Sequence, residues 1–297
     1  MPVYMVTYRS IVWRFFPSNY IFINFNKYQM KFQLKNIIAV LAIMLAIASC
    51  SNDDSNAETI TGKGKLAVEF DNVFGSANLI LNSQSNVTSQ GETLKVSDVK
   101  YIVSNIVLTK EDGSTFVYPR TESYFIVSEA NVASHVLELE NIPAGNYTKI
   151  KFGIGVDETQ YNAGQTVQGD FFAQAQNEDM AWTWSAGYKH ILFEGMFTSS
   201  TVTAPTVFMV HTGKSGANYN YMDVTLDFTD KALVRTTITP EIHIFADVAK
   251  IIDGTNKIKL TDNNMGGMGA MIMSGANLPL VTANLRNMFT VDHVHND

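Results

Sequence analysis

The stretch Val99-Lys-Tyr-Ile-Val-Ser-Asn-Ile-Val-Leu108, followed by Glu111-Asp-Gly113 and Thr115-Phe-Val-Tyr118, indicates the fold class of this 297-residue chain. β-Branched and aromatic residues dominate both runs, and an Asp-Gly pair between two such runs is typical of a tight turn. The sequence therefore predicts a β-hairpin at this point.

Similar strand signals recur on both sides of this hairpin. They are short apolar or alternating runs separated by glycine, proline and asparagine, and no sustained helical periodicity occurs before residue 247. They lie at 65–70, 124–127, 136–139, 147–156, 190–197, 206–212, 222–228, 232–239 and 241–247. Many short strands of this kind predict an all-β fold, an antiparallel β-sandwich that is immunoglobulin-like in style.

Two segments interrupt the strand pattern. Residues 157–180 are expected to form a long inserted loop, whose carboxylates are either simply solvated or bind Ca²⁺. Residues 253–297 are expected to be irregular, with a Met/Gly-rich part at 265–273 and weak helical character at 278–289.

The beginning of the chain resembles a lipoprotein export signal. After Met30 come two lysines and an apolar run that is too short to span a bilayer, and then Ile47-Ala48-Ser49-Cys50, which has the form of a bacterial lipobox. We therefore expect misassigned upstream sequence at 1–29, a signal peptide at 30–49, a lipidated Cys50 with a polar tether at 50–63, and one β-sandwich domain at 64–297. The expected location is the cell envelope, as an outer-membrane lipoprotein on the periplasmic or the surface-exposed face.

The charge of the mature part restricts its partners. The first 50 residues hold five of the 21 basic residues and none of the 28 acidic ones, which leaves 16 against 28, a formal charge of −12. A domain this acidic repels nucleic acid and suits cations, so no nucleic-acid partner is expected. Cys50 is the single cysteine, so an internal disulfide is impossible.

The pair His293-Val-His295 is the sharpest local signal for metal binding. In an extended segment the two rings share one face with Cα atoms about 7 Å apart, so both can reach one metal ion. Asp292 and Asp297 would orient the rings by accepting hydrogen bonds. The alternative is a disordered polar tail.

Four more histidines lie in the mature part. His211 closes an apolar strand, His190 follows the Gly187-Tyr188 turn, and His243 alternates with isoleucines. Taken alone, a histidine in such a position is more often a hydrogen-bonded structural residue than a metal ligand. Several histidines on one rim, with the His-x-His pair folded against them, would form a metal site. His135 is expected at the surface.

Methionine and tryptophan offer further candidates with open alternatives. Met265, Met268, Met271 and Met273 are soft ligands that favour Cu(I), or they are packing residues under a long connection. Trp182 and Trp184 are expected to point to the same face of an extended segment, as core or rim aromatics.

Three motifs in sequence order carry a family resemblance. They are Trp182-Thr-Trp184, Gly187-Tyr-Lys-His190 and His211-Thr-Gly213, and with Ile142-Pro-Ala-Gly-Asn-Tyr147 before them they resemble the MbnP-like copper-binding family of periplasmic proteins associated with methanobactin. The resemblance implies a copper site that Trp182 or Trp184 helps to shape. In some relatives a dihaem partner enzyme oxidises a tryptophan near the copper. Many members carry a cysteine after the His-x-Gly element, where this chain has Lys214-Ser-Gly-Ala, so any site here rests on imidazole, thioether or oxygen.

These observations predict a binding protein and not an enzyme, because the common nucleophile, zinc-protease and nucleotide motifs are missing. We expect a membrane-anchored lipoprotein that sequesters or delivers copper through His211, His293 and His295, with His190 and His243 as further ligands. The alternative is a surface interaction module that binds glycan or protein and holds no metal.

Overall fold

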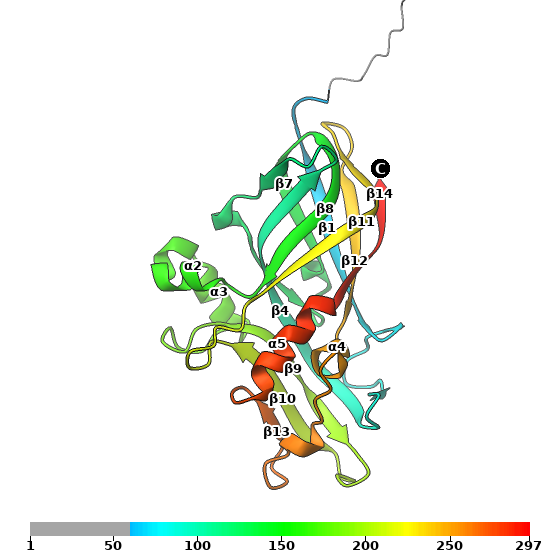
Figure 1. Cartoon of the computed structure of the whole chain (residues 1–297), viewed down its shortest axis with the longest axis vertical. Coiled ribbons are helices and arrows are strands. Elements are labelled where there is room, and N and C mark those ends of the chain that lie inside the picture. The colour runs from blue at the N-terminus through cyan, green and yellow to red at the C-terminus, as the bar shows by residue number, and fades with distance from the viewer. Residues whose placement is uncertain (1–59) are drawn as a thin grey trace, which may run out of the picture. The chain divides into compact units, whose positions relative to one another are not determined.

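Strand β4 (Thr93–Lys110) is the central strand of the larger of two sheets in the computed structural model, which describes residues 60–297 (Figure 1). Its first half pairs with β9 (Lys189–Thr198) and its second half with β8 (Gly145–Ile154), both antiparallel. A single strand can serve both neighbours in this way because it is 18 residues long.

The larger sheet has the order β11-β8-β4-β9-β10-β13, and three short strands also pair with β4. Its remaining strands are β10 (Thr206–Gly213), β11 (Met222–Val234), β13 (Ala270–Ile272), β3 (Asn86–Val87), β5 (Thr115–Val117) and β6 (Tyr124–Ser128).

The smaller sheet has the order β14-β12-β1-β2, with β7 also paired to β1. Its strands are β1 (Lys63–Phe74), β2 (Ala77–Asn78), β7 (Val136–Pro143), β12 (Pro240–Asp247) and β14 (Phe289–Asn296). In Figure 1 the red strand β14 lies beside β12.

The two sheets pack face to face through alternating apolar side chains. In β1, Leu66, Val68 and Phe70 are fully buried, while the residues between them are only half-buried. Phe70 makes edge-to-face contacts with Tyr101 of β4, Phe152 of β8 and Phe289, at centroid distances of 5.9, 5.6 and 6.0 Å. Because each contact of this kind adds about 1 kcal/mol to the burial of its rings, this group fixes the two sheets against each other.

The inserted segment after β8 carries two short helices, α2 (Glu158–Ala163) and α3 (Phe171–Asn177), with a 3-10 turn, η3 (Gln165–Gln168), between them. The Asp157 side chain caps α2 by accepting a hydrogen bond from the Gln160 amide at 3.1 Å. Phe171 and Phe172 are buried in a second apolar cluster, together with Ile102 of β4. Apolar burial therefore turns most of the expected loop into ordered structure.

The remaining helices are short and connect strands. They are η1 (Arg120–Glu122), η2 (Val132–Ser134), α4 (Lys250–Asp253), η4 (Thr261–Asn263), α5 (Asn277–Asn284) and η5 (Leu285–Asn287). None of the helices in residues 60–297 combines the length and the hydropathy that crossing a bilayer requires.

The predicted all-β, sandwich-like fold is confirmed. Two pairings depart from the antiparallel pattern, because β1 runs parallel to β12 and β10 runs parallel to β13. The strands expected at 222–228 and 232–239 are largely one continuous strand, β11. Strands β13 and β14 had no strand signal of their own. The upstream sequence, signal peptide, Cys50 and most of the tether lie outside the described residues.

Candidate metal centre

Strands β12 and β14 bring three histidines together on the outer face of the smaller sheet. His243 of β12 is the direct cross-strand partner of His293 of β14, and Glu241 is the partner of His295. Residues two apart in a strand share a face, so His295 lies on the same side as the other two rings. Within residues 60–297 these histidines form a group whose candidate ligand atoms all lie within 4.8 Å of one another.

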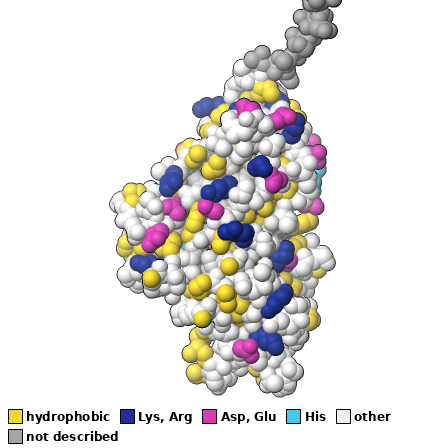
Figure 2. All heavy atoms as spheres, in the orientation of Figure 1, with side chains coloured by type: hydrophobic (Ala, Val, Ile, Leu, Met, Phe, Trp, Pro, Cys, Tyr) yellow, Lys and Arg dark blue, Asp and Glu magenta, His cyan; other side chains and the backbone are white. Residues whose placement is uncertain are grey.

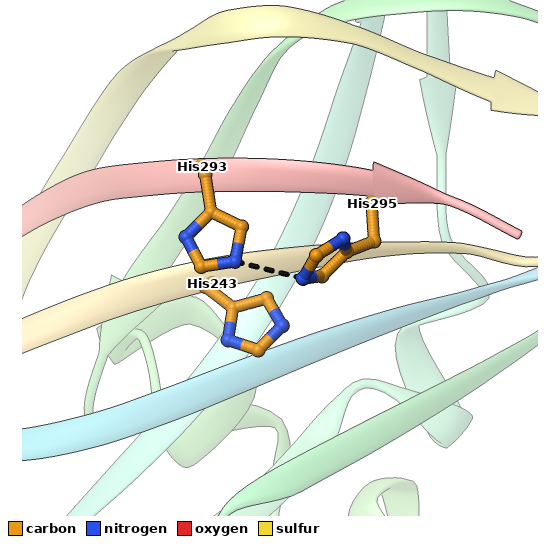
Figure 3. Close-up of side chains that lie close together, drawn as sticks. All are labelled: His243, His293 and His295. Atoms are coloured by element: carbon orange, nitrogen blue, oxygen red, sulfur yellow. Dashed lines mark hydrogen bonds between the residues drawn. The ribbon is translucent and has the colours of Figure 1, made fainter.

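The three imidazoles converge closely (Figure 3). His243 and His293 are stacked with ring centroids 4.3 Å apart and an interplanar angle of 13°. The ring of His295 stands almost perpendicular to both, and its Nε2 lies 2.9 Å from Nε2 of His293. The arrangement points several imidazole nitrogens at one small volume.

Three carboxylates surround the histidines. Glu69 of β1 is the register partner of His243, and its Oε2 lies 2.6 Å from His243 Nδ1. Asp292 Oδ2 lies 2.6 Å from His293 Nδ1, the orienting contact predicted for it. Glu241 Oε2 lies 3.9 Å from His243 Nε2. At the right-hand edge of Figure 2, histidine atoms lie between acidic side chains, so a cation meets negative charge there.

The donor set fits a transition metal ion. His243 Nε2 is buried and forms no hydrogen bond within residues 60–297, although Nδ1 of the same ring is engaged by Glu69. A tetrahedral ion with N ligands at about 2.0–2.1 Å separates two nitrogens by about 3.3 Å. The 2.9 Å between His293 and His295 is only slightly shorter.

A β-bulge at Asp292 determines which way the His-x-His pair faces. His243 pairs with His293 but Ile244 pairs with Val291, so Asp292 has no partner in β12. Val291 and Val294 both pack against the core despite their odd spacing. If Asp292 were paired in a regular ladder instead of bulged, it would lie opposite His243, and His293 would lie opposite Ile242 and face the core.

His211 and His190 lie elsewhere, on strands β10 and β9 of the larger sheet. His211 is 4% exposed, and its Nε2 lies 2.6 Å from Glu194 Oε1, while its Nδ1 has no hydrogen-bond partner within residues 60–297. Neither residue belongs to a group of candidate metal ligands in the described chain. Of the five histidines expected at one site, only His243, His293 and His295 come together in the described chain.

His190 is held as a neutral, structural side chain. Its Nδ1 lies 3.0 Å from the carbonyl oxygen of Asn220, and burial lowers the pKa of the ring to about 4. Gly155 faces the ring, and a Cβ at that position would lie 2.3 Å from His190 Cγ. His135 is half-buried, with Nε2 3.1 Å from the carbonyl oxygen of Ser128, and lies outside the three-histidine cluster.

The two tryptophans have different surroundings. Trp184 stacks on Tyr161 with centroids 4.8 Å apart and meets Phe172 edge-to-face at 5.0 Å. Trp182 lies beside His211, with ring centroids 6.3 Å apart, and Lys189 Nζ lies 5.7 Å from the centre of its ring. Trp184 is therefore a packing residue, whereas Trp182 borders a buried polar group.

The methionines of the Met/Gly-rich part do not fill a core. Met265, Met268 and Met271 are 57%, 74% and 45% exposed. They lie at the edge of the larger sheet, where β13 pairs with β10, and are not part of the histidine cluster.

Sequence reasoning missed Glu69 and Glu241. The second has a local signal, because Glu241-Ile-His243 alternates and places carboxylate and imidazole on one face. Glu69 has none, since it approaches His243 only through the parallel pairing of β1 with β12.

A comparison with protein-family models agrees with the family resemblance of the sequence motifs at 182–184, 187–190 and 211–213. A family model described as MbnP matches residues 63–274. No curated protein matches the chain. Among solved structures, MbnP from Methylosinus trichosporium is similar, with 13% sequence identity and a TM-score of 0.40, over 66% of this chain and 80% of that one.

Proposed function

The chain belongs to the MbnP family, and from this membership and the histidine cluster we propose that it binds copper through His243, His293 and His295. The family is associated with methanobactin and copper, and for this reason we propose copper as the metal that the cluster binds. The family model ends at residue 274, so His293 and His295 are donors that the match itself does not include. His243 lies inside the matched range, so the proposed site joins one residue of the family domain to two residues that follow it.

One observation carries the proposal: three imidazoles from two paired strands converge, and the inward nitrogen of His243 is buried without a hydrogen-bond partner in the described chain. A buried polar atom without a partner costs free energy that a metal ion recovers. Imidazole binds copper more tightly than the other divalent first-row ions. The donor set therefore suits copper without a thiolate.

The cluster is accessible enough for exchange. The His293 side chain is 42% exposed and His295 is also exposed. Ligands at the surface let a partner or chelator approach the ion directly, which suits sequestration or delivery better than a permanently enclosed cofactor. The proposal is of a binding protein, and it assigns no catalytic step.

We place the protein in the cell envelope, attached through lipid at Cys50 after removal of residues 30–49. The lipobox and the polar residues after it support this assignment. Replacement of Cys50 by serine should move the protein from the membrane fraction to the soluble fraction of the producing cells. Membrane association that survives Cys50→Ser would overturn the assignment.

For modification by a dihaem oxidase we propose Trp182 as the target, because Trp182 lies beside His211 of the larger sheet while Trp184 is packed among Tyr161 and Phe172. This position is separate from the histidine cluster of the smaller sheet, so the oxidation is proposed independently of copper binding there. Peptide mass spectrometry of protein from its native cells would show oxidation at Trp182. Modification confined to Trp184 would contradict this choice.

The central test is copper uptake by the purified protein. We expect about one equivalent of tightly held copper by elemental analysis after a weak-chelator wash, and loss of most of it in His293→Ala/His295→Ala. His135→Ala is the control, because His135 lies outside the cluster. Unchanged uptake in the double variant would refute the site, and a wild-type protein without copper would favour the interaction module.

A further inference from the structure

The two glutamates next to His243 lie at different distances from its two ring nitrogens. Glu69 Oε2 is 2.6 Å from Nδ1, which is a hydrogen-bond distance. Glu241 Oε2 is 3.9 Å from Nε2, too far for a hydrogen bond. The Glu69 carboxylate therefore contacts Nδ1 and orients the His243 ring. The Glu241 carboxylate lies on the side of Nε2, the nitrogen that points to the other two histidines.

Glu241 also occupies the right position in the sheet. It is two residues before His243 on the same face of β12 and is the direct cross-strand partner of His295. Its carboxylate, that of Glu69 and a ring nitrogen of His243 lie within 4.8 Å of one another. The side chain is 35% exposed, so it has room to turn toward an ion.

We infer that Glu241 supplies an oxygen ligand beside the three imidazoles, and that the cluster therefore selects copper(II) over copper(I). This inference rests on the proposed function. Copper(II) favours nitrogen and oxygen ligands, whereas copper(I) is favoured by thiolate and thioether ligands. The ligand atoms that converge here are imidazole nitrogens and carboxylate oxygens. Cys50 precedes the described part, and the exposed methionines of 265–271 lie at the edge of the other sheet, where β13 pairs with β10.

The charge around the site agrees with this selection. Glu69, Glu241 and Asp292 place three carboxylates around the histidines. Opposite charge at short range stabilises a dication more than a monocation. An anionic oxygen ligand should therefore strengthen copper(II) binding and leave copper(I), held by imidazoles alone, almost unaffected.

The sheet supplies a matched control for Glu241. Ala67 of β1 has Glu241 as its partner in β12 and Glu138 as its partner in β7. The two glutamates thus flank the same residue on opposite sides, and only Glu241 is on the side of the histidines. Replacing either by glutamine removes one negative charge from the same row of the sheet.

The experiment compares both oxidation states in the purified protein. Copper(II) affinity is measured by competition with a chromophoric chelator, and copper(I) affinity by anaerobic competition with bicinchoninate. We expect Glu241→Gln to weaken copper(II) binding at least about 10-fold, to change copper(I) binding less than about 2-fold, and to alter the copper(II) hyperfine pattern in electron paramagnetic resonance. Glu138→Gln should match the wild type in all three.

Different results would overturn the oxygen ligand, the selectivity for copper(II) and the copper site itself. Wild-type copper(II) affinity and an unaltered spectrum in Glu241→Gln would overturn the oxygen ligand while leaving the histidine site intact. Equal weakening of both oxidation states would overturn the selectivity. Undiminished copper binding in His293→Ala/His295→Ala would instead refute the proposed function.

Discussion

His243 and His293 face each other across the β12–β14 pair, with their rings stacked 4.3 Å apart. The stacking follows from their position as direct register partners on one face of the sheet. Each ring has a carboxylate 2.6 Å from its Nδ1, Glu69 for His243 and Asp292 for His293. Nε2 of His293 faces Nε2 of His295 at 2.9 Å, and Nε2 of His243 is buried without a hydrogen-bond partner among residues 60–297, so the Nε2 atoms are the ones that a shared metal ion would meet.

Glu69→Gln should weaken copper binding about 10-fold, because the carboxylate that orients His243 and makes its ring more basic is lost. Competition titration measures the change. Asp71→Asn is the control, since Asp71 follows on the same strand and face but is paired with Phe245. Equal effects of the two substitutions would show that only long-range charge matters and would contradict an orienting role.

Copper should protect strand β14 against hydrogen exchange. A metal held by His243, His293 and His295 links β14 to β12, and ligand at 100 times its dissociation constant stabilises the folded state by about 2.7 kcal/mol. Hydrogen–deuterium exchange of the peptide at 289–296, with and without copper, tests this. Strand β13, an edge strand of the other sheet, should exchange at the same rate in both samples; uniform protection of both strands would argue against a local link.

Acid should destabilise the protein partly through His190. Its pKa is about 4 in the fold, because burial disfavours the charged ring, against about 6.5 in an unfolded chain. The unfolded state therefore takes up a proton first, so stability that is fully present above pH 6.5 is lost as the pH falls toward 4, by roughly 3 kcal/mol. Urea unfolding in EDTA at several pH values should show a shallower pH dependence for His190→Gln than for the wild type. Parallel pH profiles would contradict the assignment.

Glu92→Ala should lower the free energy of unfolding by about 3 kcal/mol. The Glu92 side chain, which is 2% exposed, accepts hydrogen bonds from the Leu260 amide at 2.9 Å and from the amide and hydroxyl of Thr261 at 2.7 and 2.6 Å. Its removal leaves buried donors without an acceptor. Urea denaturation measures the loss, and Glu122→Ala, at an exposed glutamate, should stay within about 0.5 kcal/mol of the wild type. A loss no larger than that of Glu122→Ala would show that water replaces the carboxylate.

Most of the fold was predictable because its strands alternate. In β1 the apolar residues Leu66, Val68 and Phe70 face the core, as the sequence pattern indicates. Strand β14 was not predictable, since its outward residues are histidines and its inward valines, Val291 and Val294, are three apart, a spacing that fits a helix and not a regular strand. Only the bulge at Asp292 reconciles that spacing with a buried face.

Part of the histidine cluster was also predictable from the alternation of side chains along a strand. Alternation alone places His293 and His295 on one face, and the structure has them there. That His243 joins them depends on β14 pairing with β12, which is a property of strand order and not of local sequence. The apolar neighbours of His211 indicate burial equally well for a ligand and for a structural residue, and the position of β10 in the other sheet separates it from the cluster.

The order of the strands along the chain has a consequence for biosynthesis. Strand β14 follows every other strand of the described sandwich, yet it contributes two of the three imidazoles. During synthesis, His243 is therefore made before the other two histidines, His293 and His295. The three-histidine cluster therefore forms only when β14 pairs with β12. A metal ion that needs all three imidazoles would be bound late in folding, and a chain that ends before β14 would lack two of the three ligands.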